Sequence, residues 1–185
     1  MSDFTLYWNI ISQPSRAVKS LIDIGKLSCS LQNVNIAKLE QRKKEFIDMY
    51  SIGKVPVMKS GDFVLGESGA IMIYLCERYP QLIKYYGETL EQRAITNQYV
   101  SWYQNFFRPF MVAPVRLYLT AAITQQPIYE HQKKTHIDGL LDVIEKFNEI
   151  LAKNKTKFIA GDRLTIADLL FFHEMTNMVY LGLDQ

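Results

Sequence analysis

The sequence predicts an α/β domain followed by an all-α domain. Residues 4–8 alternate apolar and mixed side chains as a strand does, and a helix follows directly, because Pro14 suits a first helical turn. After Pro80 no segment alternates like a strand. Apolar residues between 137 and 151 instead recur at helical spacing, which is typical of helices packed on a core. We therefore expect mixed α/β structure up to Pro80 and helices beyond it.

Local signals predict the elements of the first domain. Val18 and Leu21 give the first helix a buried stripe, and Gly25 ends that helix. Pro56 precedes an apolar run and lacks a ladder donor, so it belongs at the start of a strand, and we expect the bond before it to be cis. Ser68 opens the last helix. The expected elements are strand 4–8, helix 14–24, strand 29–36, helix 39–50, strands 56–60 and 63–65, and helix 68–79.

Helical signals continue through the second domain. Residues 89–92 have the pattern of a capping box, which opens a long helix bent around Pro109 and Pro114, and Pro127 marks the next break. A second apolar stripe is expected to face a core and consists of Ile137, Leu140, Leu141, Ile144, Phe147 and Leu151.

The last helix is expected to be central in the second domain. Thr165 and Asp168 occupy its N-cap and N3 positions, so we assign both a structural role as a capping box. Apolar side chains then cover every face of the helix; they are Leu169, Leu170, Phe171, Phe172, Met175, Met178 and Val179.

The composition excludes several classes of function. The chain of 185 residues is 48% hydrophobic, which is enough for a core, and its net charge of +2 is too balanced for a nucleic-acid partner. The basic residues 38–44 are interleaved with Glu40 and Glu45, as on a solvated helix face. No apolar run approaches a membrane span, and Asp3 and a strand stand where a signal peptide would lie. We expect a soluble, cytoplasmic protein without a membrane partner.

The cysteines and histidines give no sign of metal or redox chemistry. Cys29 and Cys76 lie far apart without a CxxC pattern, so both are expected to be small core residues. His131, His136 and His173 show neither metal-ligand spacing nor a paired nucleophile. We therefore expect no metal and no catalytic histidine.

The turn of residues 11–16 is the strongest candidate for chemistry. It follows a strand and opens a helix, so Ser12 carries a hydroxyl at an electropositive helix N-terminus. Such a hydroxyl can donate to a bound thiolate and favour it over the thiol. The alternative is that Ser12 or Ser15 merely caps the helix.

Four motifs together resemble the glutathione transferases. They are S-Q-P-x-R-A at 12–17, K-V-P at 54–56, G-D-F-x-L-x-E-S at 61–68 and G-D-R-L-T-I-A-D at 161–168, and the first is most similar to the serine-type theta class. The resemblance runs the length of the chain. It implies a thioredoxin-like glutathione-binding domain over residues 1–80, a linker over 81–87 and an all-α domain over 88–185.

The resemblance implies a glutathione site in the first domain. Ser12 would stabilise the thiolate, and the backbone of Val55 beside Pro56 would pair with the cysteinyl part of glutathione. Glu67 and Ser68 would hold the γ-glutamyl end, where the Glu67 carboxylate can meet the ligand's ammonium group.

The resemblance extends to four further residues. Gln41 stands where theta enzymes often have a histidine, and it keeps an amide donor. Arg42 and Lys54 are explained equally well as solvated charges and as contacts to the glycyl carboxylate. Arg108 matches an arginine near the acceptor side or the dimer seam, although capping of a helix break before Pro109 explains it equally well.

The favoured hypothesis is a homodimeric glutathione transferase that conjugates glutathione to small hydrophobic electrophiles, or dehalogenates them, with glutathione as co-substrate and no cofactor. The alternative is a glutathione-binding or scaffold protein on the same fold. Ser12 and Ser15 stand where a CxxC would lie, which disfavours disulfide exchange. The chain stops at Gln185, where theta proteins continue through further helices, so we expect a fragment or a short protein with an open acceptor site.

Overall fold

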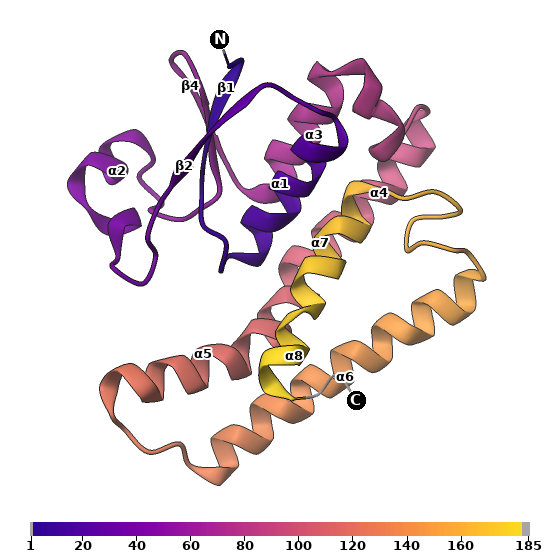
Figure 1. Ribbon diagram of the computed structural model, residues 1–185. Coiled ribbons are helices and arrows are strands. Elements are labelled where there is room, and N and C mark those ends of the chain that lie inside the picture. The colour runs from indigo at the N-terminus through magenta and orange to yellow at the C-terminus, as the bar shows by residue number, and fades with distance from the viewer. Residues whose placement is uncertain (1, 183–185) are drawn as a thin grey trace. The chain divides into compact units, whose positions relative to one another are not determined.

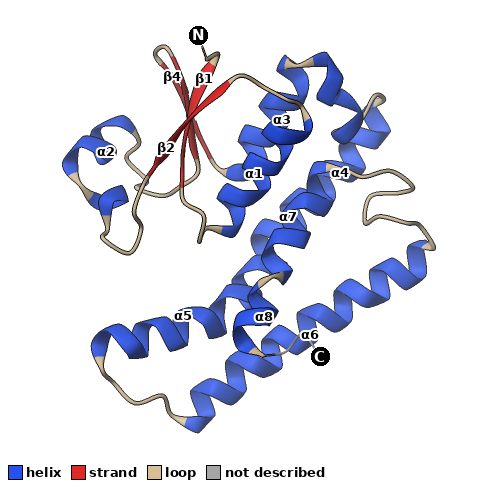
Figure 2. Cartoon of the chain, in the orientation of Figure 1, coloured by secondary structure: helices blue, strands red, loops and turns tan. Residues whose placement is uncertain are grey.

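The structure is a computed structural model that describes residues 2–182, and the chain forms two compact units, Met1–Thr89 and Leu90–Gln185. Every strand of the described residues lies in the first unit (Figure 2). That unit contains β1 (Phe4–Trp8), α1 (Gln13–Ile24), β2 (Cys29–Asn33), the 3-10 helix η1 (Glu40–Arg42), α2 (Lys44–Met49), β3 (Val57–Ser60), β4 (Phe63–Gly66), α3 (Ser68–Arg78) and the 3-10 helix η2 (Pro80–Tyr85). The second unit contains α4 (Leu90–Trp102), the π-helix η3 (Tyr103–Phe107), α5 (Arg108–Thr124), α6 (Glu130–Asn154), α7 (Ile166–Met175) and α8 (Asn177–Leu181).

The first unit is a thioredoxin-like α/β domain built on a four-stranded sheet. The strand order is β2-β1-β3-β4, with β1 and β2 parallel and the other neighbours antiparallel. Helices α1 and α3 cover one face of the sheet, and α2 lies on the other (Figure 1). Together with the helical second unit, this confirms the predicted fold class.

Helix α1 forms where the sequence predicts it, and its end differs in detail. Val18 and Leu21 are fully buried, as the stripe requires. Gly25 caps the helix in a right-handed conformation, and the left-handed residue is Lys26, with φ 50°. A Cβ on Gly25 would lie 3.0 Å from a methyl group of Leu82, so glycine favours close packing here rather than supplying backbone freedom.

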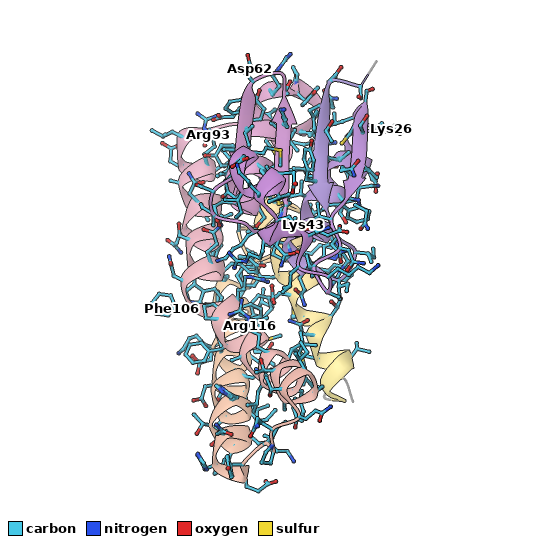
Figure 3. All side chains as sticks on the ribbon, turned by 90° about the vertical axis from the view of Figure 1, so that its left-hand side faces the viewer. Lys26, Lys43, Asp62, Arg93, Phe106 and Arg116 are labelled. Carbon is cyan, nitrogen blue, oxygen red and sulfur yellow. The ribbon has the colours of Figure 1, made fainter. Side chains whose placement is uncertain are left out.

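The segment from residue 33 to residue 50 differs from the prediction of a strand to residue 36 and one helix over 39–50. β2 ends at Asn33, and the helix is divided into η1 and α2 at Lys43, whose backbone is extended (labelled in Figure 3). A carboxylate oxygen of Glu40 accepts a hydrogen bond from the Asn35 N–H at 2.7 Å. This bond closes a local turn in place of a regular helix start, and Leu39 adopts the left-handed region with φ 55°.

The helix from Leu90 to Thr124 comprises α4, η3 and α5 and has 35 residues. By length and composition it could cross a membrane, which corrects the prediction that no apolar run approaches a span. Mostly buried core helices of soluble proteins share this property, but only 22% of the apolar 18-residue window of this helix is buried. Tyr103 and Phe107 of the helix are buried in the helical unit. Pro114 lies inside α5, and Figure 1 shows α5 turning away from the direction of α4.

Phe171 of α7 lies at the centre of the helical unit. Its ring centroid is 4.7 Å from that of Phe107, 5.0 Å from that of Phe147 and 5.5 Å from those of Trp102 and Tyr103. These rings come from α4, η3 and α6, so the prediction that α7 is central is confirmed.

Three apolar residues that were predicted to face the core are exposed instead. They are Leu141 at 50%, Phe172 at 62% and Val179 at 59% exposure. Leu141 and Phe172 each follow a buried residue directly and therefore point about 100° away from it around the helix. Val143 takes the buried position in α6, and the last helix is divided into α7 and α8 at Thr176.

The capping box at the start of α7 is confirmed. One carboxylate oxygen of Asp168 accepts from the backbone N–H and from the hydroxyl of Thr165, both at 2.8 Å. The other accepts from the Ile159 N–H at 2.9 Å. Asp168 therefore fixes both the helix start and the loop before it.

Replacing Asp168 with alanine should lower the free energy of unfolding by about 2–4 kcal/mol, because three hydrogen bonds to one carboxylate are lost. Urea unfolding measures this loss. Asp162→Ala is the matched control, because Asp162 makes a single exposed contact of 3.4 Å and its loss should change little. Equal stability of the two variants would contradict the structural role of Asp168.

Candidate functional site

One end of the sheet brings together most of the residues predicted to form the site. In the strand register Tyr7 pairs with Val57, and Val57 pairs with Gly66. β1 ends just after this row, β3 begins at it and β4 ends at it. The segments that follow β1, precede β3 and follow β4 therefore leave the sheet at the same edge, and they carry Ser12, Val55–Pro56 and Glu67–Ser68 respectively.

Ser12 is the N-cap of α1 and is 9% exposed. Its Oγ accepts a hydrogen bond from the Ser15 N–H at 3.4 Å, which confirms that Ser12 caps the helix. Capping uses an acceptor position of the oxygen, and a hydroxyl has one donor hydrogen in addition. Ser12 is therefore able to cap the helix and to donate to a ligand at the same time.

Asn9 and Arg16 hold the turn that carries Ser12. The side-chain amide of Asn9 donates to the Val34 carbonyl at 3.0 Å, and its oxygen accepts from the Ile11 N–H at 3.0 Å. The guanidinium of Arg16 donates to the Ile10 carbonyl at 2.8 Å, which gives this residue a structural role in the turn. The sequence analysis missed Asn9; the signal was an asparagine directly after a strand, where its side chain often bonds the nearby backbone.

The Val55–Pro56 bond is cis, as predicted. Directly after the neighbouring strand β4, Glu67 has φ 63° and ψ 114° and serves as the N-cap of α3. Ser68 is the first residue of that helix and is buried. The first amides of a helix have no partners within it, so this helix start can receive an anion.

Gln41 and Arg42 belong to η1 and lie against the turn at Gly53, just before Lys54. Arg42 Nη1 is 3.4 Å from the Ile52 carbonyl oxygen. A Cβ on Gly53 would lie 2.9 Å from the backbone oxygen of Gln41 and 3.1 Å from Arg42 Nη1. The side-chain oxygen of Gln41 is buried and has no hydrogen-bond partner among the described residues. The structure thus gathers Gln41, Arg42 and Lys54 around one turn.

Arg108 belongs to the helical unit and is paired with Glu174, whose side chain is fully buried. The hydroxyl of Tyr103 donates to Glu174 at 2.8 Å, and the amide of Asn177 donates to its other carboxylate oxygen at 2.9 Å. Burial and the charge of Glu174 raise the pKa of Tyr103, which keeps its proton. The sequence analysis missed Glu174, although a carboxylate close after the apolar run Leu169–Phe172 was a visible signal.

The thiols of the chain are protonated at neutral pH. Burial, and after it the charge of Glu77, raises the pKa of Cys76 to about 12. Cys29 is only partly buried, which corrects the expectation of a core residue, and this partial burial also raises its pKa. Within residues 2–182 no three His, Cys, Asp or Glu side chains are grouped closely enough to hold a metal ion. A nucleophilic sulfur at this site therefore has to come from a ligand.

Two family models match most of the chain. The glutathione S-transferase N-terminal domain matches residues 2–77, and the glutathione S-transferase C-terminal domain matches residues 118–185. The human protein glutathione S-transferase theta-2B is 31% identical over 182 residues, which are 97% of this chain and 73% of that protein.

Solved structures agree with the family models. Human glutathione transferase theta-2, in complex with glutathione and an unknown ligand, superimposes with a TM-score of 0.91 at 28% identity, over 98% of this chain and 74% of that one. A human theta-class transferase in complex with the glutathione conjugate of 1-menaphthyl sulfate gives a TM-score of 0.92 at 29% identity, over 100% of this chain and 75% of that one.

Proposed function

The chain belongs to the glutathione S-transferase family and is a glutathione transferase, and from this premise we propose that the sheet edge at Ser12 binds glutathione and activates its thiol for attack on small electrophiles. The observation that carries this proposal is the row Tyr7–Val57–Gly66, which brings three separate segments to one edge. Each segment offers a different group: a hydroxyl, the backbone before a cis-proline and a helix start.

Activation requires a preference for the thiolate over the thiol. A free thiol with a pKa of about 8.5 is only a few per cent ionised at neutral pH. Lowering that pKa by about two units takes about 2.7 kcal/mol, which one hydrogen bond to a charged sulfur and a helix N-terminus can together supply. In our proposal the Ser12 hydroxyl donates to the sulfur and need not ionise itself.

The remaining residues of the proposed site bind parts of glutathione that are remote from its sulfur. We propose that the backbone of Val55 beside Pro56 pairs with the cysteinyl part. The carboxylate of Glu67 meets the ammonium group, and the start of α3 at Ser68 receives the γ-glutamyl carboxylate. Contacts to the glycyl carboxylate come from the cluster Gln41, Arg42 and Lys54. Gln41 can contribute its side-chain NH2 group as a donor to that carboxylate.

The electrophile, assembly and location follow the family. We propose a small hydrophobic electrophile in a detoxification reaction, and the exposed side chains of Ile10 and Ile11, directly before Ser12, support an apolar acceptor. We also propose a homodimer in the cytoplasm. Phe106 supports an interface, because it is exposed and projects outward from η3 (Figure 3). Arg108 remains a candidate for the acceptor side or the dimer seam.

The proposal is tested with glutathione and a panel of electrophiles that includes aryl halides, alkyl halides and aralkyl sulfates. We expect glutathione to bind in calorimetry and at least one electrophile to be conjugated faster than in buffer. Glutathione in which the thiol is replaced by a hydroxyl is the control and should bind without reacting. Binding without conjugation of any electrophile would contradict the activating role of Ser12 and favour the binding-protein alternative.

A further inference from the structure

Tyr50 lies at the corner between β4 and α3, and none of the roles proposed above involves it. It follows α2 directly, and its ring packs on the apolar cluster that contains Phe46 and Val57. The end of its phenol lies against Gly66, because a Cβ on Gly66 would be 2.0 Å from Tyr50 Oη and 2.1 Å from Cζ. The phenol therefore occupies the space that a side chain at residue 66 would fill.

The residue after this contact has an unusual backbone. Glu67 has φ 63°, a region that residues other than glycine rarely adopt, and such a conformation persists only where the surroundings fix it. The preceding residue, Gly66, is fixed on two sides, by its pairing with Val57 in the sheet and by the Tyr50 ring against its Cα. By packing against Gly66, Tyr50 thus helps to fix the backbone of Glu67, the residue that caps the start of α3.

The hydroxyl of Tyr50 is also affected by the charge of Glu67 at this corner. Burial and the negative charge of Glu67 raise its pKa, so the hydroxyl keeps its proton at neutral pH. The Oη that lies against Gly66 is therefore a neutral hydroxyl, which fills this corner without adding a negative charge beside Glu67.

We propose that Tyr50 is a positioning residue for the γ-glutamyl part of glutathione, holding the Gly66–Glu67 corner so that the Glu67 carboxylate selects ligands with a free α-ammonium group. The inference rests on the proposed glutathione site. It adds a specificity role for a residue that reaches the site through Gly66 and Glu67 rather than by touching the sulfur.

The first test is Tyr50→Phe, which keeps the ring and removes the hydroxyl. The KM for glutathione should rise about 3- to 10-fold with kcat unchanged, because the ring loses the Oη that packs against Gly66, and this corner acts on binding and not on the reacting sulfur. The KM for an analogue that lacks the α-amino group should not change. Tyr79→Phe is the matched control: it removes another phenol hydroxyl of the same unit, which donates to the Asp3 carboxylate at 3.1 Å, and its loss should leave both KM values unchanged.

The second test examines the packing of the Tyr50 phenol against Gly66. Gly66→Ala should raise the KM for glutathione at least 10-fold in the wild-type background, because the new methyl group has to displace the phenol. In a Tyr50→Ala background the same substitution should have little further effect, and in a Glu67→Gln background Tyr50→Phe should have none.

Two results would overturn the inference. One is an unchanged KM for glutathione in Tyr50→Phe, and the other is an equal rise for glutathione and the deaminated analogue, which would indicate a general structural role. Failure of the wild-type protein to bind glutathione would instead overturn the proposed function, so the two failures are distinguishable. Thermal melting of each variant verifies that it is folded.

Discussion

Ser12→Ala is expected to raise the pKa of the bound glutathione thiol towards its free value and to lower turnover by about 10- to 1000-fold, with a modest change in glutathione affinity. Binding and ionisation are separable, because in the proposed site Val55, Glu67 and Ser68 hold parts of the tripeptide remote from the sulfur. The hydroxyl meets only the reacting atom, where its contact matters most. Titration of thiolate absorbance in the glutathione complex measures the effect.

Ser15→Ala is the matched control for this experiment. Ser15 lies in the same turn and its hydroxyl is buried, without a hydrogen-bond partner among the described residues, so its loss should leave the titration unchanged. Ser12→Ala also removes a helix cap worth about 1 kcal/mol, so melting is recorded for both variants and kinetics are compared at a temperature where both are folded. Identical thiol midpoints in wild type and Ser12→Ala would remove Ser12 from the mechanism.

Glu174→Ala is expected to lower the free energy of unfolding by about 3–5 kcal/mol, the largest stability effect that we predict. The substitution leaves the charge of Arg108 without its buried partner, and the Tyr103 hydroxyl and Asn177 amide lose their acceptor. Chemical unfolding measures the loss.

A double-mutant cycle separates the ion pair from the other contacts of Glu174. Arg108→Met combined with Glu174→Leu should cost clearly less than the sum of the two single substitutions, because the paired charges are removed together. Asp138→Ala breaks the exposed Lys134–Asp138 pair and should change stability by less than about 1 kcal/mol. Additive effects at Arg108 and Glu174 would contradict a coupled buried pair.

The parts of this protein that local patterns could predict are those fixed by near neighbours in the chain. The β1–turn–α1 segment depends on alternation, a proline and an N-cap serine within residues 4–24, and the structure reproduces it. The capping box at Thr165 and Asp168 spans three residues and was equally readable. The motifs around Ser12, Val55 and Glu67 identified the family, although their roles in binding remain predictions.

The parts that could not be predicted depend on contacts between distant residues. Arg108 and Glu174 are 66 positions apart, and only the packing of α7 against η3 and α5 brings them together. The helix expected over 39–50 is preceded by a turn that the Glu40–Asn35 bond closes, and it is divided at the extended residue Lys43; periodicity shows neither feature. Leu141 and Phe172 are apolar, and the sequence does not say that their side of the helix is exposed.

Because of the side chain of Asn9, the position of Ser12 depends on β2 having already joined β1. It fastens the Ser12 turn to Asn33 and Val34 at the end of β2, the strand reached only after the α1 crossover. The hydroxyl is therefore fully in place only when residues 4–34 have closed into a β-α-β unit. Under the proposed function, glutathione binds this closed form alone and would add about 2.7 kcal/mol to its stability at one hundred times its Kd. Glutathione would then stabilise the folded form of the domain that activates its thiol.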